Sequence, residues 1–288
     1  MTYDEKKDIW CYESGDDRFP EKLKYITDPP KRIYLKGSLP DSDKPAVAMV
    51  GARNCTPYGR DMARVFSFRL AKNGVSIISG MALGIDGWSH QGALEAGGRT
   101  YAVLGSGVDV CAPVTHQKLY NSILNRGGII SEQKPGTGPF PANFPKRNRI
   151  ISGLSDAILV VEAGMSSGSL ITADFALTQG KDVFVIPGRI GDEMSAGCNR
   201  LINQGAIPVM TPEDILERLG VESKPSQIQA LSDEEYSVYE KISSEPISLS
   251  ALAASMQGSY ANTQRIVRKL IKNRYIVEFG KNRYVRSV

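Results

Sequence analysis

The sequence predicts an α/β protein with an extended Rossmann-like, doubly wound parallel sheet, followed by a small C-terminal winged-helix domain. Three observations support this fold class. Short apolar runs alternate with helix-like segments over about 170 residues, nearly every run ends in a loop that contains glycine, and the end of the chain changes to a basic, helix-rich pattern.

Seven apolar runs have the length and composition of strands that are buried on both faces. They span residues 46–50, 75–79, 100–104, 128–131, 157–161, 183–186 and 207–210. The segments between them have helical spacing, as in Met62, Phe66 and Leu70, or in Ile171, Phe175 and Ala176. Because strand and helix alternate, right-handed crossovers are expected to make the strands parallel.

We expect four parts in the chain. An N-terminal segment, 1–44, packs on the core of a Rossmann-like domain, 45–220, and a polar linker, 221–230, leads to a winged-helix domain, 231–288. The last part has helix-like segments at 233–243, 249–256 and 262–273, then a basic hairpin at 275–285, which is the order of a winged helix-turn-helix.

Composition excludes several protein classes. With 41% hydrophobic and 23% charged residues, no membrane-length apolar run and a charged start, the chain is expected to be cytoplasmic, without a membrane partner. The 4 cysteines are scattered and only 2 histidines occur, so we expect no disulfide, no metal and no cofactor. The net charge is +4, but residues 257–288 carry 8 Lys/Arg and 1 Glu, so they hold +7 and the rest −3. This asymmetry indicates a polyanion partner or, alternatively, a solvated basic face.

Ligands of such sheets bind beyond the carboxyl ends of the strands. There, Ser166, Ser167, Gly168, Ser169 and Thr172 open a helix directly after a strand. Backbone N–H groups and hydroxyls at the positive end of a helix dipole form an anion pocket. The alternative is an N-cap that only begins the helix.

A basic loop provides a second candidate group, Phe144, Lys146, Arg147 and Arg149. Its cations can neutralise phosphates, and the ring offers a face on which an unpaired base can stack. The alternatives are that Phe144 only plugs the loop onto the core and that Arg149 pairs with an acid.

Arg53 follows the first apolar run, two residues after Gly51. This position directs a guanidinium into the crevice, where bidentate phosphate contact is favoured, unless the arginine forms an internal salt bridge. Asp86 is expected to serve as a helix-capping or first-turn residue.

Catalysis is not expected. No Walker sequence and no complete dinucleotide-binding fingerprint occurs, so the sequence predicts neither an ATP site nor a dinucleotide site. Glu132 and Glu162 end two strands and are the candidate pair of carboxylates for general acid/base catalysis. We therefore expect a binding protein rather than an enzyme.

Several motifs together resemble the DNA-processing family called DprA or Smf. They are Asp17-Arg18-Phe19-Pro20, Ser79-Gly80-Met81-Ala82-Leu83-Gly84-Ile85-Asp86, Gly105-Ser106-Gly107, Phe144-Pro145-Lys146-Arg147-Asn148-Arg149 and Ser167-Gly168-Ser169-Leu170. The resemblance implies a homodimer that binds single-stranded DNA, protects incoming strands and loads the RecA recombinase during natural transformation. It also implies DNA contacts at the Gly51-Ala52-Arg53 motif, Phe144, Arg147, Asn148, Arg149 and the Ser167-Gly168-Ser169 loop. Leu83 departs from the family, in which arginine is common at this position.

Two other functions remain possible from the sequence. One is a nucleotide-processing enzyme of the lysine-decarboxylase-like phosphoribohydrolase type, although the P-G-G-x-G-T motif expected there is missing. The other is a transcription regulator that grips duplex DNA through its winged helix. Its contacts to duplex DNA, or to a protein instead, would come from Arg265, Arg268, Lys269, Lys272, Lys281 and Arg283.

Overall fold

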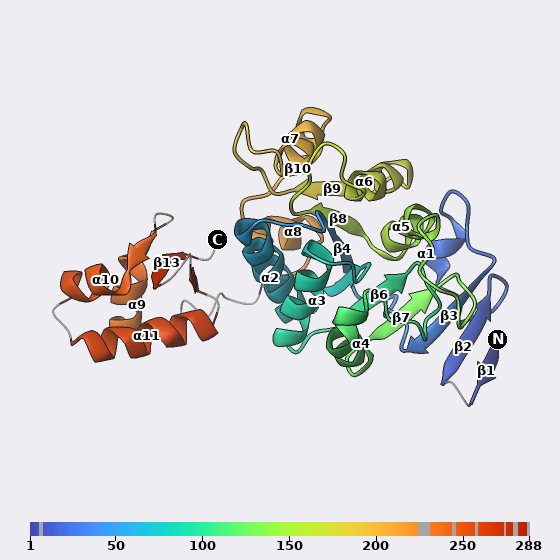
Figure 1. Ribbon diagram of the computed structural model, residues 1–288, viewed down its shortest axis with the longest axis horizontal. Helices are drawn as coiled ribbons and strands as arrows, with labels where there is room; N and C mark the ends of the chain where they lie inside the picture. Colours follow the sequence, from blue (N-terminus) through green and yellow to red (C-terminus); the bar gives the residue numbers. More distant parts are fainter. Residues whose placement is uncertain are drawn as a thin grey trace. The chain divides into compact units, whose positions relative to one another are not determined.

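The computed structural model describes residues 1–5, 8–223, 231–243, 246–256, 259–273, 275–278 and 282–286. The chain divides into two units, Met1–Glu222 and Ser223–Val288 (Figure 1). Each unit has its own hydrophobic core, so each is described separately.

The first unit is built on a ten-stranded mixed sheet. Its strands are β1 (Thr2–Asp4), β2 (Ile9–Glu13), β3 (Arg32–Gly37), β4 (Ala46–Val50), β5 (Ser76–Ser79), β6 (Thr100–Leu104), β7 (Gly128–Ser131), β8 (Ala157–Val160), β9 (Asp182–Val185) and β10 (Ile207–Pro208). Their order in space is β1-β2-β3-β7-β6-β5-β4-β8-β9-β10.

The seven predicted strands are present and parallel to their neighbours, from β7 to β10. The expectation of a wholly parallel sheet is wrong at one edge, where β1, β2 and β3 add antiparallel strands. The connection from β1 to β2 is too short for the crossover that a parallel pair requires.

Helices cover both faces of the sheet, as Figure 1 shows. They are α1 (Glu21–Lys24), α2 (Pro57–Lys72), α3 (Ile85–Glu95), the 3₁₀ turn η1 (Val114–His116), α4 (Gln117–Leu124), α5 (Asn143–Leu154), α6 (Ser169–Thr178), α7 (Ala196–Asn203) and α8 (Pro212–Arg218). Along β4, Ala48 packs in one cluster with α1, α5, α6 and α7, whereas Val47 and Met49 pack with α2, α3 and α8. Ile171, expected on the apolar face of α6, is exposed.

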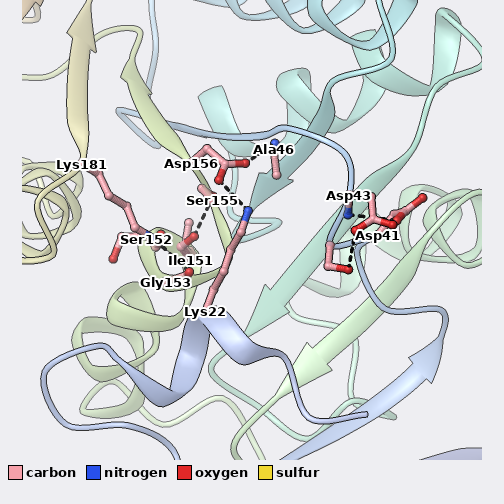
Figure 2. Close-up of polar contacts among 11 residues, drawn as sticks. Lys22, Asp41, Asp43, Ala46, Ile151, Ser152, Gly153, Ser155, Asp156 and Lys181 are labelled. Atoms are coloured by element: carbon pink, nitrogen blue, oxygen red, sulfur yellow. Dashed lines mark hydrogen bonds and ion pairs between the residues drawn. The ribbon is translucent and has the colours of Figure 1, made fainter. Parts of the chain in front are cut away.

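Polar contacts fix the amino ends of β4 and β8 (Figure 2). Lys22 of α1 donates to Asp156 at 2.6 Å, and the other carboxylate oxygen of Asp156 accepts the Ala46 backbone N–H at 2.8 Å. Lys181 donates to the carbonyls of Ser152 and Gly153 at the end of α5. Burial lowers the pKa of Lys181 to about 8. The opposite ends of β4 and β8 carry the loops of the candidate site.

Within its described ranges, the second unit combines three helices with a three-stranded antiparallel sheet. Its elements are α9 (Asp233–Glu240), β11 (Ile247–Ser248), α10 (Leu249–Ser255), α11 (Tyr260–Lys272), β12 (Ile276–Glu278) and β13 (Arg283–Arg286). Val238, Leu252, Ile266 and Leu270 bring all three helices into one core. Across the ranges described in both units, none of the helices has the length and apolar character needed to span a bilayer.

Candidate nucleic-acid interface

The candidate site lies where the strand order reverses, at the carboxyl ends of β4 and β8. β5, the next strand in sequence, pairs with one side of β4, and β8 pairs with the other side. Crevices for ligands form at such points in open α/β sheets. The two loops are in contact here, because the Ala52 N–H donates to the Glu162 carbonyl at 2.7 Å.

Gly51 permits this close approach of the loops. A Cβ at this position would lie 2.6 Å from Ile85 Cγ1 and 2.7 Å from the Glu162 carbonyl oxygen. Because both distances are well inside van der Waals contact, a larger residue would force the loops apart. The structure gives Gly51 a packing role, and its contact with DNA stays a prediction.

Arg53 and Phe144 come together at this edge of the sheet. Arg53 is exposed, and its Cζ lies 5.3 Å from the centre of the Phe144 ring, within the range of a cation–π interaction. The half-buried ring lies against Gly105, where a Cβ would come within 2.9 Å of it. Lys146 is exposed two residues further on. Phe144 therefore rests on the core and also presents part of its surface beside a cation.

Arg147 is buried and bonded to backbone carbonyls, and the contact with phosphate that the sequence predicts for it stays a prediction. Only 7% of the residue is exposed, and Nη1 donates to the Gly80 carbonyl at 2.8 Å and to the Val103 carbonyl. Burial lowers the pKa of Arg147 to about 10, which still leaves it protonated at neutral pH. Burial raises the pKa of neighbouring Asp86, and the positive charge of Arg147 opposes that rise. Arg147 therefore holds the ends of β5 and β6 in place.

Asp86 has the structural role that its position predicts. Its carboxylate accepts the backbone N–H groups of Gly80 at 3.1 Å and Ala82 at 3.4 Å. It thereby closes the turn that leads into α3.

Arg149 forms the internal ion pairs considered as the alternative to DNA contact. Its Nη2 donates to both carboxylate oxygens of Glu132 at 2.9 Å, and its Nε donates to Asp28 at 3.0 Å. Its side chain is 6% exposed. These bonds join α5 to the end of β7 and to the segment before β3, so neither Arg149 nor Glu132 has its charge unpaired.

Glu162, the other carboxylate considered for acid/base work, caps a helix. It accepts the Thr56 backbone N–H at 2.7 Å and the Thr56 hydroxyl at 2.5 Å, and Thr56 is the N-cap of α2. A Cβ on Gly59 would lie 2.5 Å from the same carboxylate. The carboxylate thus compensates the positive end of α2.

The serine-rich loop reaches the surface at the first turn of α6. Gly168 is its N-cap residue and has no side chain to cap the helix, but the Ser167 hydroxyl accepts the Ser169 N–H at 3.4 Å and the Ser167 carbonyl accepts the Leu170 N–H at 3.1 Å. Ser166 and Gly168 are exposed, and the Ser167 hydroxyl lies 2.7 Å from that of Ser169. Ser169 and Thr172 are buried, and the contact of their side chains with DNA stays a prediction. The positive end of the helix dipole at this exposed terminus remains suited to an anion.

Asn148 connects this loop to the basic helix. Its Nδ2 donates to the Gly168 carbonyl at 3.3 Å, and its Oδ1 accepts Arg147 Nε at 3.2 Å. Asn148 therefore sets the position of the serine-rich loop relative to α5, a role that the motif alone did not indicate.

Ser166 also has a feature that sequence reasoning missed. It is the central serine of Gly164-Met165-Ser166-Ser167-Gly168, which has the spacing of a nucleophile elbow. A nucleophile elbow is a strained turn, but Ser166 is not among the described residues with positive φ. Within the described ranges both histidines have partners elsewhere, since His90 contacts Thr100 and His116 contacts the Met81 carbonyl.

Phe140 is a second residue that sequence reasoning did not select. It is 60% exposed and lies just before α5, between Pro139 and Pro141. Its neighbours could have identified it, because an aromatic residue between two prolines is unsuited to the interior of a helix or a central strand.

The second unit presents a group of exposed cations. They are Arg265, Arg268 and Lys272 of α11 and Arg283 of β13. Lys269 is engaged with Glu235, and this hydrogen bond lowers the pKa of the carboxyl group. Lys281 lies outside the described residues.

Comparison with known proteins gives a consistent result. The family model described as DNA recombination-mediator protein A matches residues 10–220. Protein Smf of Escherichia coli (strain K12) is 46% identical over 202 residues, which is 70% of this chain and 54% of that protein. DNA processing protein DprA of Streptococcus pneumoniae is 43% identical over 201 residues, 70% of this chain and 71% of that protein. The chain thus spans about half the length of the Escherichia coli protein.

Two solved structures are similar to about three quarters of this chain. The X-ray structure of DprA from Streptococcus pneumoniae has a TM-score of 0.70 at 41% identity, and the match covers 74% of this chain and 75% of that chain. A structure of DNA processing protein A from Helicobacter pylori has a TM-score of 0.66 at 30% identity, and the match covers 75% of this chain and 97% of that chain. That structure concerns the single-stranded DNA binding mode of the Helicobacter pylori protein. The chain therefore belongs to the DNA recombination-mediator protein A family.

Proposed function

We propose that this chain binds single-stranded DNA, without strong sequence preference, at the carboxyl ends of β4 and β8. The observation that carries the proposal is the exposed Arg53 guanidinium over the Phe144 ring. A cation and an aromatic face suit the phosphate and the base of an unpaired nucleotide. The single-stranded DNA binding mode described for the Helicobacter pylori relative supports the proposal.

In this proposal different residues hold the phosphates and the bases. Arg53, Lys146 and the exposed turn at Ser166–Gly168 contact phosphates, and a base stacks on Phe144. Sequence tolerance follows, because every base has a π-face. Arg147, Asn148 and Arg149 act indirectly, since their bonds to protein groups position α5.

We further propose that the chain is a recombination mediator that protects incoming single strands and loads the RecA recombinase during natural transformation. It would act as a homodimer in the cytoplasm and would need no covalent chemistry. A protein that receives strands of any sequence is served by phosphate and stacking contacts rather than by base-specific hydrogen bonds.

We propose that residues 231–288 form a winged-helix domain, joined by the linker 221–230 to the Rossmann-like domain 45–220, on which residues 1–44 pack. The order α9-β11-α10-α11-β12-β13 supports this assignment, with α11 as the second helix of the helix-turn-helix. The exposed cations of α11 and β13 suit duplex phosphates or an acidic protein surface.

The experiment is a mobility-shift titration of the full chain on a mixed-sequence single strand and on its duplex. We expect preference for the single strand, with affinity that falls steeply between about 50 mM and 200 mM salt as counterions are released. Equal binding to both forms, or binding that is indifferent to salt, would contradict the proposal. Release of free base from nucleoside monophosphates would instead support the phosphoribohydrolase alternative.

A further inference from the structure

The loop that precedes α5, taken with the first residue of that helix as residues 134–143, is fixed to the protein at several points. The Gly107 N–H donates to the Thr137 carbonyl at 2.8 Å, and the Gly136 N–H donates to Asp109 at 2.7 Å. Asn143 Nδ2 donates to the Gly105 carbonyl at 3.0 Å. These contacts span the loop, so its shape is set before any ligand arrives.

Phe140 is held outward by this loop. Its N–H donates to the Gly138 carbonyl at 3.0 Å, and its carbonyl accepts the Asn143 N–H at 3.0 Å. Pro139 and Pro141 on either side restrict the backbone further, because the proline ring fixes φ. Nevertheless 60% of the residue is exposed. A large ring presented on a preorganised turn can contact a ligand with little further loss of conformational entropy.

The sequence around Phe140 favours a polyanion over other ligands, although the Asp109 carboxylate contacts the same loop through the Gly136 N–H. From Gln133 to Arg149 the sequence has no acidic residue, and it contains Lys134 and Lys146. Lys134 and Lys146 are both exposed. Exposed cations beside an exposed ring match the pattern by which proteins hold unpaired nucleotides.

Phe140 and Phe144 are separated by one tight turn. The Asn143 N–H bonds to the Phe140 carbonyl and the Phe144 N–H bonds to the Pro141 carbonyl, both in the i to i+3 pattern. A rise of about 2 Å per residue in such a turn places their Cα atoms roughly 6–8 Å apart.

We propose that Phe140 is a second stacking platform, which takes an unpaired base of the strand where it leaves the crevice over the 134–143 loop. This inference rests on the proposed binding of single-stranded DNA. It adds a residue and a direction to that site, because the strand would run from Phe144 past Phe140 between Lys146 and Lys134.

The test compares Phe140→Ala and Phe140→Trp with the parent, using the full chain and two oligothymidylates of equal length, one intact and one with abasic sites. Tyr25→Ala is the matched control, because it removes another exposed aromatic ring, 80% exposed, from outside the loop. Phe140→Ala should weaken binding of the intact strand about tenfold, leave the abasic strand unaffected and keep the salt slope of the parent. Phe140→Trp should bind the intact strand as tightly as the parent does. The fluorescence of the added tryptophan should be quenched by the intact strand only.

Each outcome separates this inference from the function on which it rests. If the parent binds the single strand and Phe140→Ala binds equally well, the second platform is wrong while the proposed function stands. Equal weakening on both oligonucleotides would also overturn stacking by Phe140. If the parent binds neither oligonucleotide, the proposed function fails, and this inference fails with it.

Discussion

The guanidinium of Arg53 lies over the ring of Phe144, with Cζ 5.3 Å from the ring centre. Arg53 follows β4 and Phe144 belongs to α5, so the contact joins two segments that are 91 positions apart in the sequence. A cation–π contact of this kind orients the guanidinium without neutralising it. Arg53 therefore keeps its positive charge for a ligand.

Replacing Arg53 by alanine should weaken binding of single-stranded DNA about tenfold or more and leave the thermal midpoint unchanged. The affinity should also depend less on salt, because the slope of log K against log salt shrinks by about 0.7 for each phosphate that the variant no longer neutralises. Titrations at several salt concentrations measure both effects. Arg99→Ala is the matched control, because Arg99 is an exposed arginine at the amino end of β6. Equal affinities and slopes for the Arg53→Ala variant and the parent would remove Arg53 from the site.

Replacing Arg147 by alanine should destabilise the fold. The carbonyls of Gly80 and Val103 would lose a donor, and buried Asp86 would lose its neighbouring positive charge. Each buried acceptor left without its donor costs about 1–3 kcal/mol in the free energy of unfolding. Urea denaturation measures the loss. A variant that unfolds like the parent but no longer binds DNA would show instead that Arg147 contacts the ligand directly.

The sequence predicts the parallel part of the sheet well, because strands buried on both faces appear as continuous apolar runs. It does not predict the edge strands, of which β1 is exposed along its whole length and has no apolar run to reveal it. The predicted carboxyl ends of the strands indicate which loops form the site, because these loops lie at one edge of the sheet. The contact between Arg53 and Phe144 is consistent with that prediction.

The burial of Arg147 and Arg149 is not apparent from the motif that contains them. Their partners include Gly80, 67 positions away, and Asp28, 121 positions away. Local sequence can indicate a cluster of cations, but it cannot indicate which of them face carbonyls and carboxylates brought together by the fold.

Protonation of His90 should destabilise the protein in acid. Burial, with smaller contributions from the charges of His116 and Arg147, lowers the pKa of His90 to about 3 from the ordinary 6.5. Its Nδ1 lies 2.6 Å from the Thr100 hydroxyl, which itself donates to the Ile77 carbonyl. The unfolded chain therefore binds one more proton between pH 6.5 and about 3, and stability falls as the pH is lowered through that window, by up to about 1.4 kcal/mol per pH unit.

The variant His90→Gln isolates this effect, because the carboxyl groups that also titrate in acid are common to both proteins. The free energy of unfolding of the variant minus that of the parent should increase as the pH falls from 7 to 4. This holds whether the variant is more or less stable than the parent at pH 7. Urea denaturation at each pH gives the difference. A difference that stays constant across this range would contradict a neutral, buried His90.

Gly168 allows the charge at the first turn of α6 to be changed without a steric cost. Its φ is −63°, and a Cβ there would have no atom within 4 Å. An aspartate at the first turn compensates the helix dipole, so Gly168→Asp should keep the stability of the fold or raise it by about 0.3–1 kcal/mol. The same carboxylate would repel a phosphate at this terminus, so binding of single-stranded DNA should fall at least about tenfold, which corresponds to 1.4 kcal/mol.

Gly168→Ala adds the Cβ without the charge and should bind like the parent. Measured together, thermal midpoints and affinities separate the two roles of this helix end: if Gly168→Asp binds as well as Gly168→Ala, no phosphate lies at the N-terminus of α6.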